Sequence, residues 1–318
     1  MSIENELSFS DIRDITQNVI SEVRKVVVGK GEVLQNIFIA LLINEHVLLE
    51  GVPGVAKTFM ANAFASVIGC SFKRIQFTPD LLPSDIVGTN VLNAKTREFE
   101  LRKGPIFANL VLADEINRAP PKTQSALLEC MAERTVTIEG VTHKLEKPFM
   151  VLATQNPLEM EGTYPLPEAQ TDRFLFKLIV DYPSEKEEVQ IIERKHQSIQ
   201  YELQQITSPE EIRAMQVAVK KVHIDEDLMK FIRDIVFKTR NDPQILIGGG
   251  PRVSLALLNA SKARAAILGR DFVTPDDIKH LARYTLFHRL ILKPEAELGG
   301  TSVDKVISRI IEEVTVPV

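Results

Sequence analysis

The sequence predicts an α/β protein with a central, mostly parallel five-stranded sheet flanked by helices, followed by a smaller all-α domain. Short apolar runs alternate with helical patterns over the first 181 residues, and strands separated by helices are typical of a parallel sheet. From about Tyr182 the pattern is helical only, with capping sequences at Ser184–Glu187 and Ser208–Glu211. We therefore expect two domains, residues 1–181 and residues 182–318.

Five apolar runs are the expected strands of the sheet: residues 46–50, 72–77, 109–114, 149–154 and 174–180. The run Asn109–Asp114 is apolar until its last residue, which suits a strand covered on both faces. Helices are expected from Phe9 to Val23 and from Pro120 to Glu133, because apolar residues recur there at helical spacing. Two insertions, near residues 81–104 and 134–147, have the alternation and turn residues of β-hairpins.

Composition favours a soluble globular protein, with 44% hydrophobic and 25% charged residues in a chain of 318. The net charge is −5 and no long basic run occurs, so nucleic acid is an unlikely partner. The longest apolar run, Ile37–Ile43, is too short to span a membrane, and the acidic amino terminus does not resemble a signal peptide. Cys70 and Cys130 form no metal-ligand spacing and suit a reducing compartment, so the expected location is cytoplasmic.

A glycine-rich turn, Gly51–Thr58, follows the apolar run His46–Glu50 and leads into the helical pattern Phe59–Ile68. A strand, a turn and a helix in this order form an anion site, because backbone N–H groups and the positive end of the helix dipole converge. The spacing is that of the phosphate loop G-x-x-x-x-G-K-[ST], in which Lys57 reaches the β- and γ-phosphates and Thr58 binds Mg²⁺. ATP and Mg²⁺ are therefore the expected ligands.

Ala56 stands where this motif usually has its second glycine. We expect its methyl group to be tolerated if φ is negative, a condition that glycine does not need. The ordinary interpretation is a Gly/Pro turn before a helix that happens to begin with Lys-Thr. Motifs further along the chain argue against it.

Two carboxylates and an amide follow the ends of neighbouring predicted strands. Asp114 and Glu115 close one apolar strand, and Asn156 comes just after the next. Because the carboxyl ends of parallel strands share one crevice, we expect Asp114 to hold Mg²⁺ through water beside Thr58. Glu115 is then the candidate general base, and Asn156 can hydrogen-bond the γ-phosphate or the attacking water. Taken alone, these residues are a solvated strand end and an Asn-Pro turn.

Two arginines are candidates for stabilising the charge that develops on the transferred phosphoryl group. Arg173 ends a short polar helix, and Arg252 follows a proline near the start of a helix in the second domain. The guanidinium fork suits the oxygens of the γ-phosphate. Either arginine could instead be a surface residue paired with an acid.

With these motifs in place, the chain resembles the MoxR family of AAA+ ATPases. The resemblance runs in order from about residue 10 to residue 290 and rests on seven stretches: Val27–Lys30, Leu49–Thr58, Gln76–Asp85, Asp114–Gln124, Ala153–Pro157, Tyr164–Gln170 and Asp172–Phe174. It implies a phosphate-loop AAA+ core with two hairpin insertions, followed by a helical lid domain.

The resemblance also implies a role for each candidate residue. The roles are Walker A for Lys57 and Thr58, Walker B for Asp114 and Glu115, sensor 1 for Asn156, arginine finger for Arg173 and sensor 2 for Arg252. The implied nucleotide-binding residues are Val28 and Gly29 near the adenine, with Gly51, Pro53, Gly54, Val55, Ala56, Lys57, Thr58 and Phe59 around the phosphates. Whether Arg252 serves the ATP of its own subunit or of a neighbour stays open.

The family further implies a ring, expected to be a hexamer, that hydrolyses ATP to remodel or mature client protein complexes. Proteins with von Willebrand factor A domains are possible separate partners. Two alternatives stay open: a nucleic-acid motor related to replicative helicases, and a nucleotide-dependent binding module that does not turn over. Arg118 could face an adjoining subunit, and Gln76 could couple Glu115 to partner binding.

Overall fold

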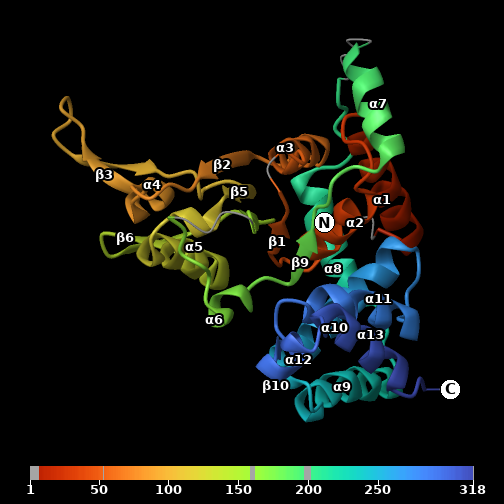
Figure 1. Ribbon diagram of the computed structural model, residues 1–318. Helices are drawn as coiled ribbons and strands as arrows, with labels where there is room; N and C mark the ends of the chain where they lie inside the picture. The colour runs from red at the N-terminus through yellow and green to blue at the C-terminus, as the bar shows by residue number, and fades with distance from the viewer. Residues whose placement is uncertain (1–6, 53, 158–161, 197–201, 318) are drawn as a thin grey trace.

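The computed structural model (Figure 1) describes residues 7–52, 54–157, 162–196 and 202–317. Its centre is a five-stranded sheet in the order β2-β5-β8-β1-β9, and every pairing in it is parallel. The strands are β1 (Val47–Glu50), β2 (Phe72–Gln76), β5 (Leu110–Asp114), β8 (Met150–Gln155) and β9 (Phe176–Ile179). The predicted five-stranded sheet is thereby confirmed.

Both faces of this sheet are buried. In β5 the side chains of Leu110 and Leu112 belong to one hydrophobic cluster, and those of Val111 and Ala113 belong to another. Successive side chains of a strand point to opposite faces, so a strand packed on both sides must be apolar throughout. This is why the sequence pattern of β5 is a continuous apolar run rather than an alternating one.

Helices cover the two faces. The first hydrophobic cluster contains α1 (Phe9–Arg24), α2 (Gly31–Leu42) and α3 (Lys57–Val67), and the second contains α5 (Pro121–Glu133). The helix predicted at the amino terminus is confirmed. It begins with a capping box in which the Ser8 hydroxyl accepts a hydrogen bond from the Asp11 N–H.

The two predicted hairpins are present beside the core. The first follows α4 (Pro83–Val87) and consists of β3 (Gly88–Leu92) and β4 (Phe99–Lys103); the second consists of β6 (Thr135–Ile138) and β7 (Val141–Lys144). Figure 1 shows the β3–β4 hairpin projecting away from the sheet. The two hairpins touch, since the Asn90 amide donates a hydrogen bond of 2.8 Å to the Glu139 carboxylate.

The rest of the described chain is mainly helical. Its helices are α7 (Glu185–His196), α8 (Pro209–Lys220), α9 (Glu226–Asn241), α10 (Pro251–Ile267), α11 (Pro275–Leu286), α12 (Pro294–Leu298) and α13 (Val303–Glu313). The expectation of an all-helical region is wrong in one detail, because β10 (Ile245–Ile247) pairs antiparallel with β11 (Ile291–Leu292). Two short β-branched segments bounded by proline and glycine can pair once the helices bring them together. Elsewhere the described chain contains only α6 (Glu168–Thr171) and the 3₁₀ turn Ile116–Arg118.

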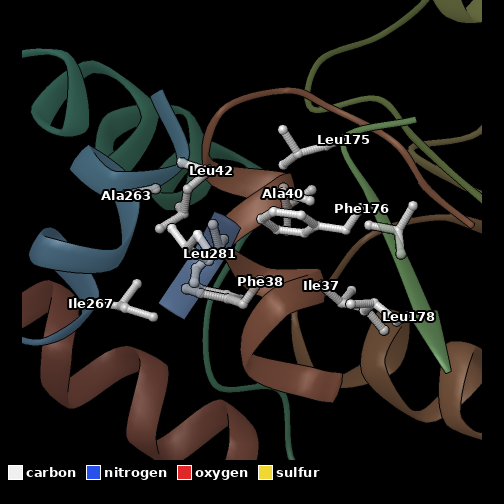
Figure 2. Close-up of a cluster of buried hydrophobic side chains, with 14 of the residues drawn as sticks. Ile37, Phe38, Ala40, Leu42, Leu175, Phe176, Leu178, Ala263, Ile267 and Leu281 are labelled. Carbon is white, nitrogen blue, oxygen red and sulfur yellow. The ribbon is translucent and has the colours of Figure 1, made fainter. Parts of the chain in front are cut away.

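Helix α2 joins the sheet to the carboxy-terminal helices. Figure 2 shows Phe38 of α2 in one apolar cluster with side chains of β9, α10 and α11. The labelled members are Ile37, Phe38, Ala40, Leu42, Leu175, Phe176, Leu178, Ala263, Ile267 and Leu281. Figure 1 places α8–α13 on the side of the sheet's amino ends, and α7 apart from them near α1 and α3. Within the described ranges, no helix has both the length and the apolar character needed to cross a bilayer.

A buried histidine links three elements of the core. His46, directly before β1, is 2% exposed. Its Nδ1 accepts a hydrogen bond of 2.9 Å from the Val151 N–H, so the proton of the neutral ring is on Nε2, which lies 3.1 Å from the Met131 carbonyl. Burial lowers the pKa of His46 to about 4 from an ordinary value of 6.5.

We predict that His46 makes the protein sensitive to acid. The folded protein keeps the ring neutral while the unfolded chain takes up a proton, so this stabilisation is complete above pH 6.5 and is lost as the pH falls toward 4. Between pH 7.5 and pH 5, this one residue should lower the free energy of unfolding by about 2 kcal/mol. Urea denaturation at both pH values should show a smaller loss for His46→Gln than for the wild type. The exposed control His223→Gln should keep the wild-type loss, and equal losses in all three proteins would contradict the prediction.

Candidate functional site

The glycine-rich turn begins directly after β1, and its backbone explains two of its glycines. A Cβ atom on Gly51 would lie 2.4 Å from the Val180 carbonyl oxygen, so no side chain fits there. Gly54 has φ of +86°, a conformation that L-residues rarely adopt. Val55 is buried beneath the turn. Pro53, predicted to bind the phosphates, lies outside the described residues.

Ala56 also adopts a left-handed conformation, with φ of +61° at the N-cap of α3. The condition under which the methyl group was expected to be tolerated, a negative φ, is therefore not met. The turn needs this backbone conformation to enter the helix, and the alanine methyl group must be accommodated at a cost of about 1–2 kcal/mol. The exposure of Ala56 leaves room for the methyl group.

The two residues that begin α3 point toward the ends of neighbouring strands. Lys57 Nζ donates hydrogen bonds to the carbonyls of Gly51 and Gln155, so the ammonium group lies over the turn. Thr58 Oγ1 donates a hydrogen bond of 3.0 Å to Asp114 Oδ2. Phe59, the next residue, is 52% exposed. The predicted Walker A and Walker B residues are thus in direct contact.

A threonine that the sequence analysis did not single out holds the Asp114 carboxylate and the backbone of Glu115. The Thr154 hydroxyl donates a hydrogen bond of 2.7 Å to Asp114 Oδ1 and accepts one of 2.8 Å from the Glu115 N–H. Glu115 itself has φ of +57°, a conformation uncommon for a residue with a side chain and typical of strained functional positions.

Polar residues at the edge of the sheet hold these carboxylates. The Gln76 amide and the Arg118 guanidinium both donate to Glu115 Oε2, at 2.8 Å and 3.0 Å. Arg74 donates to Asp114 Oδ2 through Nε at 2.9 Å. The sequence analysis missed Arg74, although it lies two residues before Gln76 and so on the same face of β2.

Asn156 lies at the same edge of the sheet. It follows β8, it is 4% exposed, and the preceding Gln155 carbonyl accepts a hydrogen bond of 3.3 Å from the Gly51 N–H. This contact places the residue after β8 beside the beginning of the phosphate loop. The carboxyl ends of β1, β5 and β8 therefore bring together the residues that the sequence predicted for this crevice.

Val28 and Gly29, the residues expected near the adenine, precede α2. Gly29 has φ of +69°, and a Cβ atom on it would clash with the Glu187 carboxylate of α7. The neighbouring Lys30 donates a hydrogen bond of 2.7 Å to the Asp181 carbonyl, just beyond β9. Because Gly51 abuts Val180, residues 28–30 lie on the phosphate-loop side of the sheet.

The two candidate arginines lie near the amino ends of the strands, opposite the phosphate loop. Arg173 precedes β9 and donates a hydrogen bond of 2.6 Å to the Leu128 carbonyl. Arg252, at the start of α10, forms an ion pair of 2.9 Å with Asp172. Asp172 also receives a hydrogen bond of 2.7 Å from Arg289, whose side chain is 4% exposed. Both predicted arginines thus share one location, and it is not the phosphate loop of their own chain.

Arg289 attaches the carboxy-terminal helices to the segment before β9 that contains Arg173. Its guanidinium donates to the carbonyls of Asp172, Phe174 and Leu175, at 3.1, 2.6 and 3.1 Å. The contact closes one side of a cavity of about 320 Å³ that is also lined by Arg134, Arg173 and Arg252. This cavity, between the core and α10, is also lined by Glu45 and Asp172, and Asp172 pairs with both Arg252 and Arg289.

The donor set at the phosphate loop fits Mg²⁺. Thr58 and Asp114 supply a hydroxyl and a carboxylate, the hard oxygen ligands that Mg²⁺ prefers when phosphates and water complete its coordination. Among the described residues, no cluster of three or more His, Cys, Asp or Glu side chains suggests another metal site. Cys70 and Cys130 are buried, and burial raises the pKa of each thiol to about 12.

Comparisons with known proteins agree with this geometry. The ATPase family associated with various cellular activities (AAA) matches residues 46–176, and the AAA lid domain matches residues 237–310. A solved structure of a protein from Cytophaga hutchinsonii superposes with a TM-score of 0.91 at 43% identity, covering 98% of this chain and 97% of that one. The fold and the site therefore place the chain in the class of AAA-type ATPases with a lid domain.

Similar sequences identify the family within this class of ATPases. Chaperone MoxR1 of Mycobacterium tuberculosis is 43% identical over 310 residues, which cover 95% of this chain and 82% of that protein. YeaC of Bacillus subtilis is 50% identical over 97% of both chains, and Protein MoxR of Methylorubrum extorquens is 27% identical over 97% of this chain and 96% of that one. The chain belongs to the MoxR family of AAA+ ATPases.

We predict that Ala56→Gly stabilises the protein. Relief of the left-handed strain contributes about 1–2 kcal/mol, and the greater freedom of glycine in the unfolded chain offsets about 0.5–1 kcal/mol. A net gain of about 0.5–1 kcal/mol in the free energy of unfolding is expected from chemical denaturation. The converse variant Gly54→Ala should lose stability. A destabilised Ala56→Gly would mean that the alanine is not strained.

Proposed function

We propose that this chain hydrolyses ATP to ADP and phosphate with Mg²⁺, and that it uses the reaction to remodel or mature other protein complexes. The observation that carries the proposal is the meeting of Lys57, Thr58, Asp114 and Glu115 at one edge of the sheet. Thr58 and Asp114 touch although 56 positions separate them in the chain. Such a constellation of ammonium, hydroxyl and carboxylate groups suits a nucleotide triphosphate with its metal ion.

Each residue has a separate task in this proposal. Lys57 binds the β- and γ-phosphates, and Thr58 with Asp114 holds the Mg²⁺, which supplies positive charge to the phosphate oxygens. Glu115 orients the attacking water and accepts its proton. Asn156, at the end of the neighbouring strand, hydrogen-bonds the γ-phosphate or the water.

The position of the arginines supports a ring of subunits. Strand β1 separates the phosphate loop from the cavity of Arg173 and Arg252 by about 13 Å, the length of four extended residues. An arginine side chain cannot bridge that span within one chain. We therefore propose that both arginines act on the ATP of a neighbouring subunit, in a closed ring that we expect to be a hexamer.

The chaperone-like part of the proposal rests on the relatives and on the hairpins. One relative at 43% identity is named a chaperone. The β3–β4 hairpin exposes three large apolar side chains, Val91, Leu92 and Phe99, which face solvent at 46%, 55% and 72%. We propose that this hairpin contacts a client or a partner such as a protein with a von Willebrand factor A domain.

The alternatives have less support. A nucleic-acid motor would bind a polyanion, and the net charge of −5 disfavours it. A module that binds nucleotide without turnover would not need a candidate base, yet Glu115 lies beside Asp114 at the end of β5.

We predict that Glu115→Gln binds ATP and loses turnover. The amide keeps the size of the side chain but cannot accept a proton, so the rate of phosphate release should fall about 10²–10⁴-fold. Binding of a fluorescent ATP analogue, which depends on Lys57 and the loop, should stay near that of the wild type. Glu312→Gln, an exposed change on α13, is the matched control and should keep full activity. Full turnover in Glu115→Gln would remove this residue from the proposed role.

We predict that two inactive variants restore activity when mixed. Arg173→Ala keeps its phosphate loop and Lys57→Ala keeps its arginine, so a mixed ring contains interfaces with both groups intact. At equal amounts about a quarter of the interfaces are complete, and phosphate release should recover to about a quarter of the wild-type rate. The same mixture prepared with Arg252→Ala in place of Arg173→Ala tests the second arginine. No recovery at any ratio would contradict action across subunits.

A further inference from the structure

Arg74 forms an ion pair with the carboxylate that we assign to the metal. Its Nε and Nη2 atoms lie 2.9 Å and 2.8 Å from Asp114 Oδ2, and Thr58 Oγ1 lies 3.0 Å from the same oxygen. The Asp114 side chain is 9% exposed, whereas that of Arg74 is 48% exposed. Asp114 Oδ2 thus accepts hydrogen bonds both from Thr58, a candidate metal ligand, and from the long cationic side chain of Arg74 on the edge strand β2.

A guanidinium group at this position competes with a metal ion. Mg²⁺ held by Thr58 and, through water, by Asp114 needs a free electron pair on each of these oxygens. A positive charge within hydrogen-bonding distance of the same oxygen withdraws them and repels the metal ion. Because Arg74 is half exposed, water screens this repulsion but does not remove it.

Gln76 links Arg74 to the second carboxylate of the site. The Arg74 Nη2 atom donates to Gln76 Oε1, and Gln76 Nε2 donates to Glu115 Oε2 at 2.8 Å. Gln76 therefore remains as a partner for the guanidinium when Asp114 is taken by another cation. The Arg74 side chain can therefore leave Asp114 and still keep its hydrogen bond to Gln76.

We propose that Arg74 is a built-in competitor of Mg²⁺ for Asp114, and that it sets the magnesium concentration at which the subunit takes up its nucleotide. This inference rests on the proposed function, since it requires that Asp114 and Thr58 hold Mg²⁺. A purely structural ion pair at the sheet edge would not change metal binding selectively, so the two roles can be separated by measurement.

The test is the factor by which Mg²⁺ strengthens binding of a fluorescent ADP analogue, measured with excess MgCl₂ and with EDTA. The metal also binds the nucleotide in solution, but this effect is the same for all variants and cancels in the comparison. Arg74→Gln should raise the factor about fivefold over the wild type, because one nearby positive charge is removed. Arg74→Lys keeps the charge and should stay close to the wild type.

Lys73→Gln is the matched control, since it removes the same charge from the opposite face of β2. It should leave the factor unchanged. In an Asp114→Asn background, Arg74→Gln should have no effect, because the shared carboxylate is gone.

Several results would overturn the inference. They are an unchanged factor in Arg74→Gln, an equal rise in Lys73→Gln, or weaker nucleotide binding in Arg74→Gln with and without metal, which would make Arg74 a phosphate ligand. Failure of the proposed function is distinguishable, because then the wild-type protein itself would bind the analogue weakly and without any effect of Mg²⁺.

Discussion

The parallel direction of the five strands is the constraint on which the rest of the structure depends. It brings every strand's carboxyl end to one edge, so that loops from distant parts of the sequence meet there. The hydrogen bond between Thr58 and Asp114 exists only because β1 and β5 run the same way. The same direction sends the residues before β9, among them Arg173, to the opposite edge. One architectural choice thus creates two chemically different sites on a single chain.

These two sites differ in how firmly they are held. At the phosphate-loop edge, Ala56 and Glu115 have left-handed backbones, and the loop is closed by contacts among polar side chains. Strain of this kind persists where the surrounding fold enforces it. At the other end of the strands, the buried Arg289 donates to the backbone carbonyls of Asp172, Phe174 and Leu175, on both sides of Arg173. Movement of the carboxy-terminal helices would therefore move the segment before β9 that carries Arg173.

Asp114 and Glu115 have hydrogen-bond partners of two kinds, some buried and some exposed to solvent. Thr154 holds Asp114 and the backbone of Glu115 from the buried side. From the exposed side Arg74 and Gln76 reach the same two carboxylates through longer, partly solvated side chains. The buried contacts set geometry, and the exposed contacts can change when a metal ion or a partner arrives. The competition that we propose at Asp114 depends on this difference between buried and exposed contacts.

Local patterns in the sequence determined the strands, the amino-terminal helix, both hairpins and the residues of the phosphate loop, because periodicity and turn chemistry act over a few residues. They did not reveal the left-handed backbone of Ala56, since an alanine by itself gives no sign of a positive φ. They missed Thr154 and Arg74, ordinary strand residues whose importance comes from the strand beside them. The location of Arg252 beside Arg173, away from its own phosphate loop, was decided only by how α10 packs on the core. Contacts between distant segments depend on tertiary packing, and one sequence read alone contains no local signal for them.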